Sequence, residues 1–103
     1  MTEKRKRTYS LKKVRTLIEQ NKKINPGIPV ISSINDMGFS VYEAHQEITK
    51  LENRHFYKSM TQYSNNKVWL DVYKKEIKGI PVYIKFKLLE DRFLLTSFKP
   101  DDS

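Results

Sequence analysis

The C-terminal part of the chain alternates apolar and polar residues with the period of two that a half-buried β-strand requires. Over residues 82–88 the apolar side chains fall on one face, and Tyr83, Lys85 and Lys87 fall on the other. The run 93–98 has a similar strand character. We therefore expect one face of these strands to meet a core and the opposite face to remain open.

Residues 55–73 contain two further runs rich in aromatic and β-branched residues, which flank Ser-Asn-Asn at 64–66. Because asparagine tolerates positive φ, these three residues predict a tight turn, and the whole stretch predicts a β-hairpin. Within the first run, Lys58 shares parity with Phe56 and Met60. A simple alternation of inward and outward side chains does not explain that parity.

The last predicted strand follows a turn at residues 90–92. Its residues Leu94, Thr96 and Phe98 fall on a common face by simple alternation. Pro100 is expected to end the strand, because proline cannot donate to a β-ladder.

The N-terminal half predicts helices. Thr8 or Ser10 is placed to cap a first helix that ends near Asn21. Four of its apolar residues form one stripe: Leu11, Val14, Leu17 and Ile18. A later helix over 40–52 begins with a capping box between Ser40 and Glu43. Its expected buried stripe consists of Val41, Ala44, Ile48 and Leu51.

The segment between these helices contains Asn-Pro-Gly at 25–27, which predicts a turn. Pro29 is expected to keep the next residues extended. Residues 30–31 then form a short edge strand or pack as a loop. A very short helix is expected to begin at residue 32 or 33 and to stop at Gly38.

This order of elements predicts an α+β fold in which N-terminal helices pack on one face of a mainly antiparallel C-terminal sheet. The 103 residues fit a single domain, 1–103. The charged run at 1–7 is expected to be a flexible, solvated basic terminus; a phosphate-contacting arm is the alternative.

The chain has a formal net charge of +8, which points to a polyanionic partner such as nucleic acid. An anionic membrane surface or an acidic protein partner is also compatible with this charge. The charge is unevenly distributed, because residues 1–23 carry a net +7, residues 24–53 a net −3 and residues 54–103 a net +4. We therefore expect a directional basic surface.

With no cysteine and only two histidines, the chain is expected to hold no metal and no cofactor. We expect His45 to be exposed on its helix and His55 to lie at the surface or the edge of the core. No apolar run approaches the roughly 20 residues that span a bilayer, and no signal peptide is visible. A cytoplasmic location is the expectation.

The chemistry that remains available is a basic, aromatic sheet surface. Lysines neutralise phosphates and aromatic rings stack on unpaired bases, a combination that suits single-stranded RNA. Its members are Lys58, Lys67, Lys85, Lys87 and Lys99 with Tyr57, Tyr63, Trp69, Tyr73 and Tyr83. Among the aromatic residues, Trp69 and Phe98 are expected in the core, and Tyr83 in a functional role.

RNA can be cleaved without a metal when its 2′-OH attacks the adjacent phosphate and leaves a 2′,3′-cyclic phosphate. The protein must then assist proton transfer and stabilise the dianionic phosphorane. A lysine base is unfavourable, because its ordinary pKa of about 10.4 keeps it protonated at neutral pH. We therefore assign charge stabilisation and orientation to Lys58 and Lys99, and proton transfer or positioning to Tyr83.

The C-terminal half contains a distinctive set of segments: 56–61 (Phe-Tyr-Lys-Ser-Met-Thr), 63–64 (Tyr-Ser), Trp69, 71–73 (Asp-Val-Tyr), 82–83 (Val-Tyr), Lys85 and 97–99 (Ser-Phe-Lys). In these segments the chain resembles the MqsR family of bacterial toxins, which are messenger-RNA endonucleases with a RelE-like fold. The first half matches only in the order and type of its elements.

This resemblance implies that Lys58, Tyr83 and Lys99 are active-site residues. Which of them acts as acid or base stays open. Leu70 stands where the family has a glutamine, and leucine can neither donate nor accept a hydrogen bond. The family's GCU-type cleavage site therefore carries over only weakly. The expected substrate-binding residues are Tyr57, Met60, Tyr63, Lys67, Leu70 and Lys85.

The resemblance further implies a toxin that cuts free messenger RNA without the ribosome. It implies a separate MqsA-like antitoxin, with contact to operator DNA only through the antitoxin complex. Two other functions remain open. One is a non-catalytic RNA-binding relative, and the other is a ParE-like toxin that acts on a protein target such as gyrase.

Overall fold

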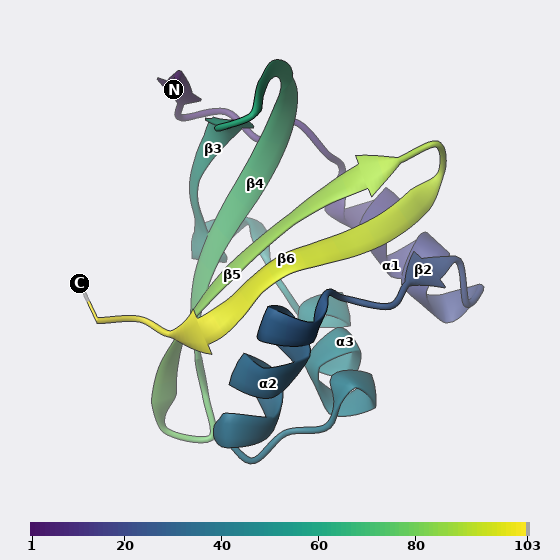
Figure 1. Ribbon diagram of the computed structural model, residues 1–103, viewed down its shortest axis with the longest axis vertical. Coiled ribbons are helices and arrows are strands. Elements are labelled where there is room, and N and C mark those ends of the chain that lie inside the picture. The colour runs from purple at the N-terminus through teal and green to yellow at the C-terminus, as the bar shows by residue number, and fades with distance from the viewer. Residues whose placement is uncertain (103) are drawn as a thin grey trace.

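The computed structural model describes residues 1–102, in which one sheet is accompanied by three helices. The helices are α1 (Leu11–Glu19), α2 (Ile28–Asp36) and α3 (Val41–Thr49), and a 3₁₀ turn, η1, covers Asn53–His55. The strands are β1 (Glu3–Lys4), β2 (Lys23–Ile24), β3 (Phe56–Gln62), β4 (Asn65–Ile77), β5 (Ile80–Leu89) and β6 (Arg92–Pro100). They pair in the order β1-β3-β4-β5-β6-β2 (Figure 1). All pairs are antiparallel except β2 with β6, which confirms the α+β class and the mainly antiparallel sheet.

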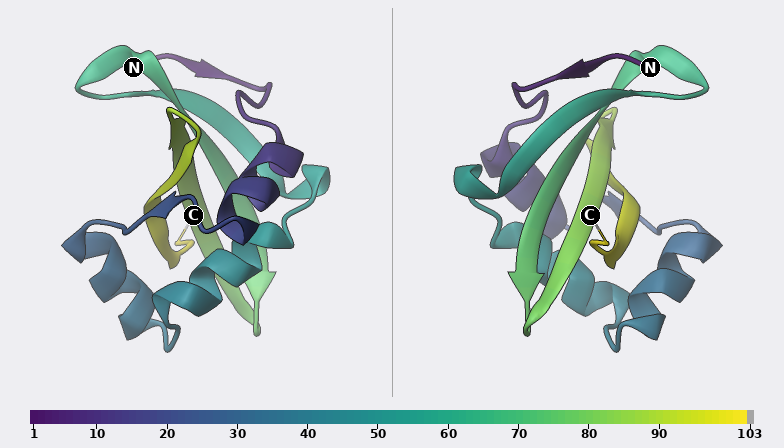
Figure 2. Two further views of the ribbon diagram at one scale, coloured as in Figure 1. Left: turned by 90° about the vertical axis from the view of Figure 1, so that its right-hand side faces the viewer. Right: turned by 90° about the vertical axis from the view of Figure 1, so that its left-hand side faces the viewer.

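The core lies between the sheet and the helices, which stand on one side of the sheet (Figure 2). All three helices contribute buried residues to this core. On the sheet side, a row of rings crosses four neighbouring strands: Phe56, Tyr73, Phe86 and Phe93, with successive centroids 5.5, 5.5 and 5.2 Å apart. The other face of the sheet is left without a covering helix and is turned toward the viewer in the right panel of Figure 2.

The α1 helix forms as its sequence predicts. The Ser10 side chain accepts a hydrogen bond from the backbone N–H of Lys13, and the helix begins at Leu11, directly after Ser10. All four residues of the predicted stripe are buried: Leu11, Val14, Leu17 and Ile18. The apolar period therefore fixes which face of α1 meets the sheet.

The α2 helix begins four residues before the earliest predicted position. Pro29 lies in its first turn instead of keeping the chain extended, so that expectation is wrong. The first turn of a helix tolerates proline because its backbone N–H groups have no partner within the helix. The predicted stop is confirmed, since Gly38 adopts a φ of +86° directly after the C-cap Met37.

The α3 helix has the predicted capping box, with both hydrogen bonds between Ser40 and Glu43 present. Ala44 and Ile48 are fully buried, as expected. The prediction for His45 is wrong, because this side chain is only 1% exposed. Its ring packs edge-on against Phe93 with 5.7 Å between the centroids.

The β3–β4 hairpin is confirmed, but its turn is not the predicted one. Gln62 pairs with Asn65, so the turn consists of residues 63–64 and the two asparagines already belong to β4. Positive φ angles occur instead in the other two hairpins, at Lys78 (51°) and Gly79 (80°) and at Glu90 (47°) and Asp91 (62°). Two consecutive positive φ angles fit two-residue turns that match the twist of the flanking strands.

A bulge at Tyr57 explains the unusual parity of β3. Phe56 pairs with Tyr73 and Lys58 pairs with Val72, so one extra residue lies between two consecutive partners of β4. Phe56 therefore faces the core, whereas Lys58 and Met60 face the open side of the sheet.

A second bulge changes the predicted face of β6. Phe86 pairs with Leu95 and Lys85 pairs with Ser97, which leaves Thr96 as the extra residue. The expectation that Leu94, Thr96 and Phe98 share a face is therefore wrong. The buried residues of this strand are Phe93, Leu95 and Phe98.

The N-terminal segment is tied to the sheet, which corrects the expectation of a frayed terminus. Glu3 pairs with Met60 in the β1–β3 ladder. Farther along, the fully buried carboxylate of Asp71 accepts hydrogen bonds from the backbone N–H groups of Thr8 and Tyr9 at 2.8–3.0 Å. These bonds fix the path of the chain between β1 and α1.

Candidate functional site

The open face of the sheet contains a hollow of about 320 Å³, which we call the open-face pocket. Its lining residues come from β3, β4, β5, β6 and the C-terminal segment: Tyr57, Lys58, Lys74, Tyr83, Lys99, Pro100, Asp101 and Asp102. The pocket therefore brings together the three residues that the sequence suggests for catalysis, Lys58, Tyr83 and Lys99.

Strand register accounts for this convergence. Tyr83 on β5 pairs with Lys74 on β4 and with Lys99 on β6. Directly paired residues of antiparallel strands present their side chains on the same face. The bulge at Tyr57 adds Lys58 of β3 to that face, so four strands contribute to one surface.

Lys58 is held by an ion pair from the other end of the chain. Its Nζ lies 2.5 Å from a carboxylate oxygen of Glu3, and its side chain is 18% exposed. The hydrogen bond from Lys58 to Glu3 raises the pKa of the Lys58 ammonium group above its ordinary value. Lys58 is accordingly a cation at neutral pH.

Tyr83 packs against a small apolar cluster formed by Met60, Leu70 and Val72. Burial raises the pKa of its phenol, although the nearby charge of Lys58 acts in the opposite direction. The phenol is therefore neutral and able to donate a hydrogen bond at neutral pH. The Nζ of Lys99 lies 5.2 Å from the centroid of the Tyr83 ring.

Lys85 follows Tyr83 on the same face of β5 and is half-buried. Burial lowers the pKa of its ammonium group, and the charges of Lys99 and Lys58 lower it further. This environment shows that several cations are crowded on one face, a feature that favours the binding of an anion.

The other suggested substrate-binding residues lie in different places. Tyr57 lines the pocket, but the Nζ of Lys74 lies 4.0 Å from the centroid of its ring and covers one face. Met60 and Leu70 are buried below Tyr83. Tyr63, 92% exposed, and Lys67 lie at or next to the β3–β4 turn.

Trp69 also differs from its expected place. It is half-buried instead of being part of the core, and the Nζ of Lys4 lies 4.0 Å from its ring centroid. Phe98 does belong to the core, as expected, and is 1% exposed.

Four residues of the pocket lining were not predicted from the sequence: Lys74, Pro100, Asp101 and Asp102. Of these, Lys74 carries the positive charge. Its Nζ lies 3.5 Å from a carboxylate oxygen of Asp101. The signal that could have revealed it is the turn at Lys78–Gly79, because a two-residue turn there sets Lys74 directly opposite Tyr83.

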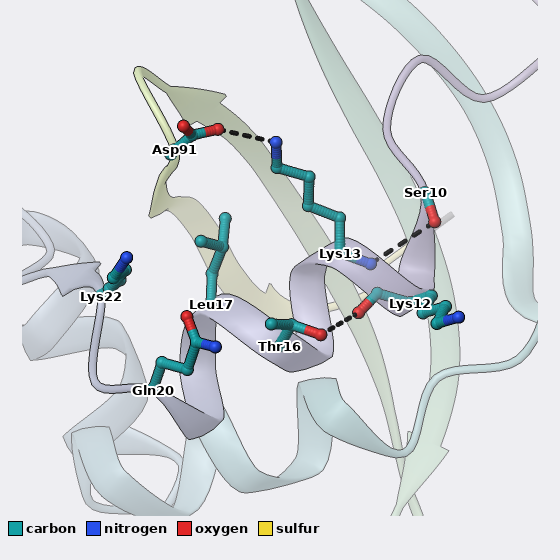
Figure 3. A pocket seen from close by; sticks show the side chains of 8 residues that line it. All are labelled: Ser10, Lys12, Lys13, Thr16, Leu17, Gln20, Lys22 and Asp91. Carbon is teal, nitrogen blue, oxygen red and sulfur yellow. Dashed lines mark hydrogen bonds and ion pairs between the residues drawn. The ribbon is translucent and has the colours of Figure 1, made fainter.

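A larger hollow of about 550 Å³ lies on the helical side, between α1 and the turn joining β5 to β6 (Figure 3). Lys13 reaches from α1 to Asp91 at 2.6 Å, and Lys12 and Lys22 also line the hollow. It is lined by a different set of residues from the open-face pocket.

Metal ions and membranes would require other features of residues 1–102. No group of three or more histidine, cysteine, aspartate or glutamate side chains in this part of the chain could hold a metal ion. None of the helices described there is long and apolar enough to cross a membrane.

Comparison with known proteins gives two matches. Residues 6–100 match the family model described as motility quorum-sensing regulator, toxin of MqsA. The mRNA interferase toxin MqsR of Escherichia coli (strain K12) is 42% identical over 52 residues, which cover 50% of this chain and 52% of that relative. The match thus spans about half the length of the curated relative. Because the family model covers nearly the whole chain, the protein belongs to the MqsR toxin family.

Proposed function

We propose that this protein is the toxin component of a type II toxin–antitoxin system and an endoribonuclease that cuts single-stranded messenger RNA. In this proposal cleavage requires neither a metal ion nor the ribosome. The observation that carries the proposal is the convergence of Lys58, Tyr83 and Lys99 on the open-face pocket. The name of the Escherichia coli relative, an mRNA interferase toxin, supports the same activity.

The protonation states of the pocket residues suit cleavage by the RNA's own 2′-OH. Lys58, whose pKa is raised by Glu3, is a poor base and a suitable partner for the phosphorane dianion. Tyr83, whose pKa is raised by burial, can donate a hydrogen bond or a proton to an oxygen of the reacting phosphate. Lys99, adjacent to Tyr83, supplies a second positive charge.

The partner in this proposal is an MqsA-like antitoxin, which the description of the family as a toxin of MqsA supports. Contact with operator DNA would then occur only within the toxin–antitoxin complex.

A second candidate function is RNA binding without cleavage. The observation that favours it is Leu70, which is buried in the apolar cluster below Tyr83 and offers no polar group to the substrate. Measured binding without cleavage would support this alternative.

The test is to incubate the purified protein with single-stranded RNA in EDTA and to map the products. We expect cleavage with 2′,3′-cyclic phosphate ends. Tyr83→Phe keeps the packed ring and removes the hydroxyl, and Lys58→Met removes the charge; each should slow cleavage by about 100-fold or more. Tyr42→Phe and Lys50→Met, at exposed positions on or next to α3, are the matched controls.

Circular dichroism and thermal unfolding establish that each variant is folded. Intact RNA at high concentrations of folded wild-type protein would contradict the nuclease proposal. Full activity in folded Tyr83→Phe and Lys58→Met would remove these two residues from the reaction.

A further inference from the structure

Lys74 is the third lysine that lines the open-face pocket, beside Lys58 and Lys99. It lies on β4, directly opposite Tyr83 in the β4–β5 ladder, and Tyr83 is in turn opposite Lys99. The three side chains therefore form a row across three adjacent strands. The Lys74 side chain is 27% exposed and lines the pocket, so its charge is partly shielded from solvent and is directed at the pocket.

Contacts with Tyr57 and Asp101 are among those that hold Lys74 in this position. Its Nζ lies 4.0 Å from the centroid of the Tyr57 ring, a cation–π contact. The same Nζ lies 3.5 Å from a carboxylate oxygen of Asp101. The tyrosine contact does not depend on the acid, so the ammonium group keeps one anchor when the carboxylate moves away.

Asp101 places a negative charge where a phosphate would meet Lys74. It lies just beyond β6, and its backbone N–H donates to the carbonyl of Pro81 at 2.9 Å. Its side chain can rotate away without breaking this backbone bond. A carboxylate and a phosphodiester each carry one negative charge and acceptor oxygens, so one can replace the other against the same ammonium group.

We propose that Lys74 binds a phosphate of the RNA substrate next to the scissile one, and that Asp101 occupies the place of that phosphate until RNA displaces it. This inference rests on the proposed function, since it assigns a substrate contact within the same site. It makes Lys74 a substrate-binding residue and Asp101 an internal competitor of the substrate.

The exchange is energetically reasonable because the 3.5 Å between Lys74 and Asp101 is long for a charge-assisted hydrogen bond, and the two side chains, 27% and 14% exposed, retain some contact with solvent. Removing the competitor should therefore strengthen RNA binding by only about two- to five-fold. Removing the cation should weaken binding and reduce the logarithmic salt slope by about 0.7, the value for one phosphate contact on a single strand.

The experiment measures binding of a short single-stranded RNA in which every 2′-OH is methylated, so that no nucleophile is present. Its affinity for the full chain is determined as a function of salt concentration. The variants are Lys74→Gln, Lys74→Arg, Asp101→Asn and the double variant Lys74→Gln/Asp101→Asn. Lys50→Gln and Asp36→Asn, at exposed positions outside the open-face pocket, are matched controls with the same changes in net charge. Cleavage of unmodified RNA by the wild-type protein is measured in parallel.

The expected result is that Lys74→Gln loses about 0.7 of the salt slope while Lys50→Gln does not. Lys74→Arg should restore the slope. Asp101→Asn should tighten binding more than Asp36→Asn does, and this gain should vanish in the Lys74→Gln background.

Equal slopes for Lys74→Gln and Lys50→Gln would overturn the assignment of Lys74. A gain from Asp101→Asn that persists without Lys74 would overturn the assignment of Asp101. If the wild-type protein fails to cut unmodified RNA, the nuclease proposal fails, and the binding data still decide whether Lys74 contacts a phosphate.

Discussion

The wild-type protein should lose stability at acidic pH because His45 is buried, and replacing His45 with leucine should remove this loss. His45 is 1% exposed on α3, and both of its ring nitrogens lack a hydrogen-bond partner among residues 1–102. Burial, and secondly the charge of Lys23, lower the pKa of the imidazole from 6.5 to about 4. The folded protein therefore holds this ring in its neutral form.

The size of the effect follows from the two pKa values. The unfolded chain binds a proton at His45 below about pH 6.5, whereas the folded chain binds it only near pH 4. The contribution of neutral His45 to the free energy of unfolding is therefore fully present above pH 6.5 and is lost as the pH falls toward 4. The complete difference corresponds to about 3 kcal/mol, and about 2 kcal/mol of it is lost between pH 7 and pH 4.5.

Urea denaturation at pH 7 and pH 4.5 measures this contribution in the wild-type protein and in His45→Leu. Carboxylate titration affects both proteins, so the difference between them isolates His45. At pH 7 we expect leucine to be neutral or stabilising by about 1 kcal/mol, because it removes buried unpaired nitrogens. At pH 4.5 the advantage of leucine should grow by about 2 kcal/mol.

His55→Gln is the matched control. His55 is half-buried, and its Nδ1 accepts a hydrogen bond from the backbone N–H of Glu52 at 2.9 Å. Its effect on stability should change less over the same pH interval. If the difference between His45→Leu and the wild-type protein stayed constant between the two pH values, the reasoning about buried neutral His45 would be refuted.

Two further predictions concern the N-terminal segment. Asp71→Asn should lower the free energy of unfolding by about 2–4 kcal/mol in urea denaturation. The reason is that an amide nitrogen, unlike the carboxylate oxygen it replaces, cannot accept the hydrogen bonds of Thr8 and Tyr9. A loss below about 0.5 kcal/mol would contradict this role. Glu3→Gln should lower the pKa of Lys58, so the alkaline decline in RNA cleavage should begin at a lower pH in a pH–rate profile. Because the Tyr83 phenol contributes to the same alkaline limb, NMR titration of the Lys58 side chain measures its pKa directly, and an unchanged pKa would exclude Glu3 from control of Lys58.

The elements that the sequence predicts best are those whose residues interact with near neighbours in the chain. The stripe of α1 and the capping box of α3 depend on positions three or four apart, and both are present in the structure. The strands β1 and β2 depend instead on distant partners, β3 and β6, and each contains only two residues. No local pattern distinguishes such short strands from loops.

The hairpin turns and the faces of the strand residues were harder to predict from the sequence, because a single residue decides each of them. Within the hairpin turns, the residues with positive φ are a lysine, a glycine, a glutamate and an aspartate, whereas the two asparagines expected to adopt it lie in β4. The bulges at Tyr57 and Thr96 each insert one residue and so reverse the alternation beyond it. Sequence alternation alone could not locate either insertion.

The same bulges explain why the candidate site could be predicted only in part. Lys58, Tyr83 and Lys99 could be selected by residue type and by resemblance, but their meeting in one pocket depends on the extra residue at Tyr57 in β3 and at Thr96 in β6. Lys74 was missed because its place opposite Tyr83 follows from the turn at Lys78–Gly79.

Leu70 connects the architecture of the open face to the chemistry proposed for it. With Met60 and Val72 it forms the apolar floor against which Tyr83 packs. A leucine in this floor restricts the phenol ring by packing, whereas the glutamine implied at this position by family resemblance would place an amide within the same cluster. Under the proposed function, recognition and proton transfer therefore depend on the lysines and Tyr83. RNA cleavage by the wild-type protein would then mean that the amide is dispensable for the reaction itself, and that Lys58, Tyr83 and Lys99 suffice for it without a polar group at position 70.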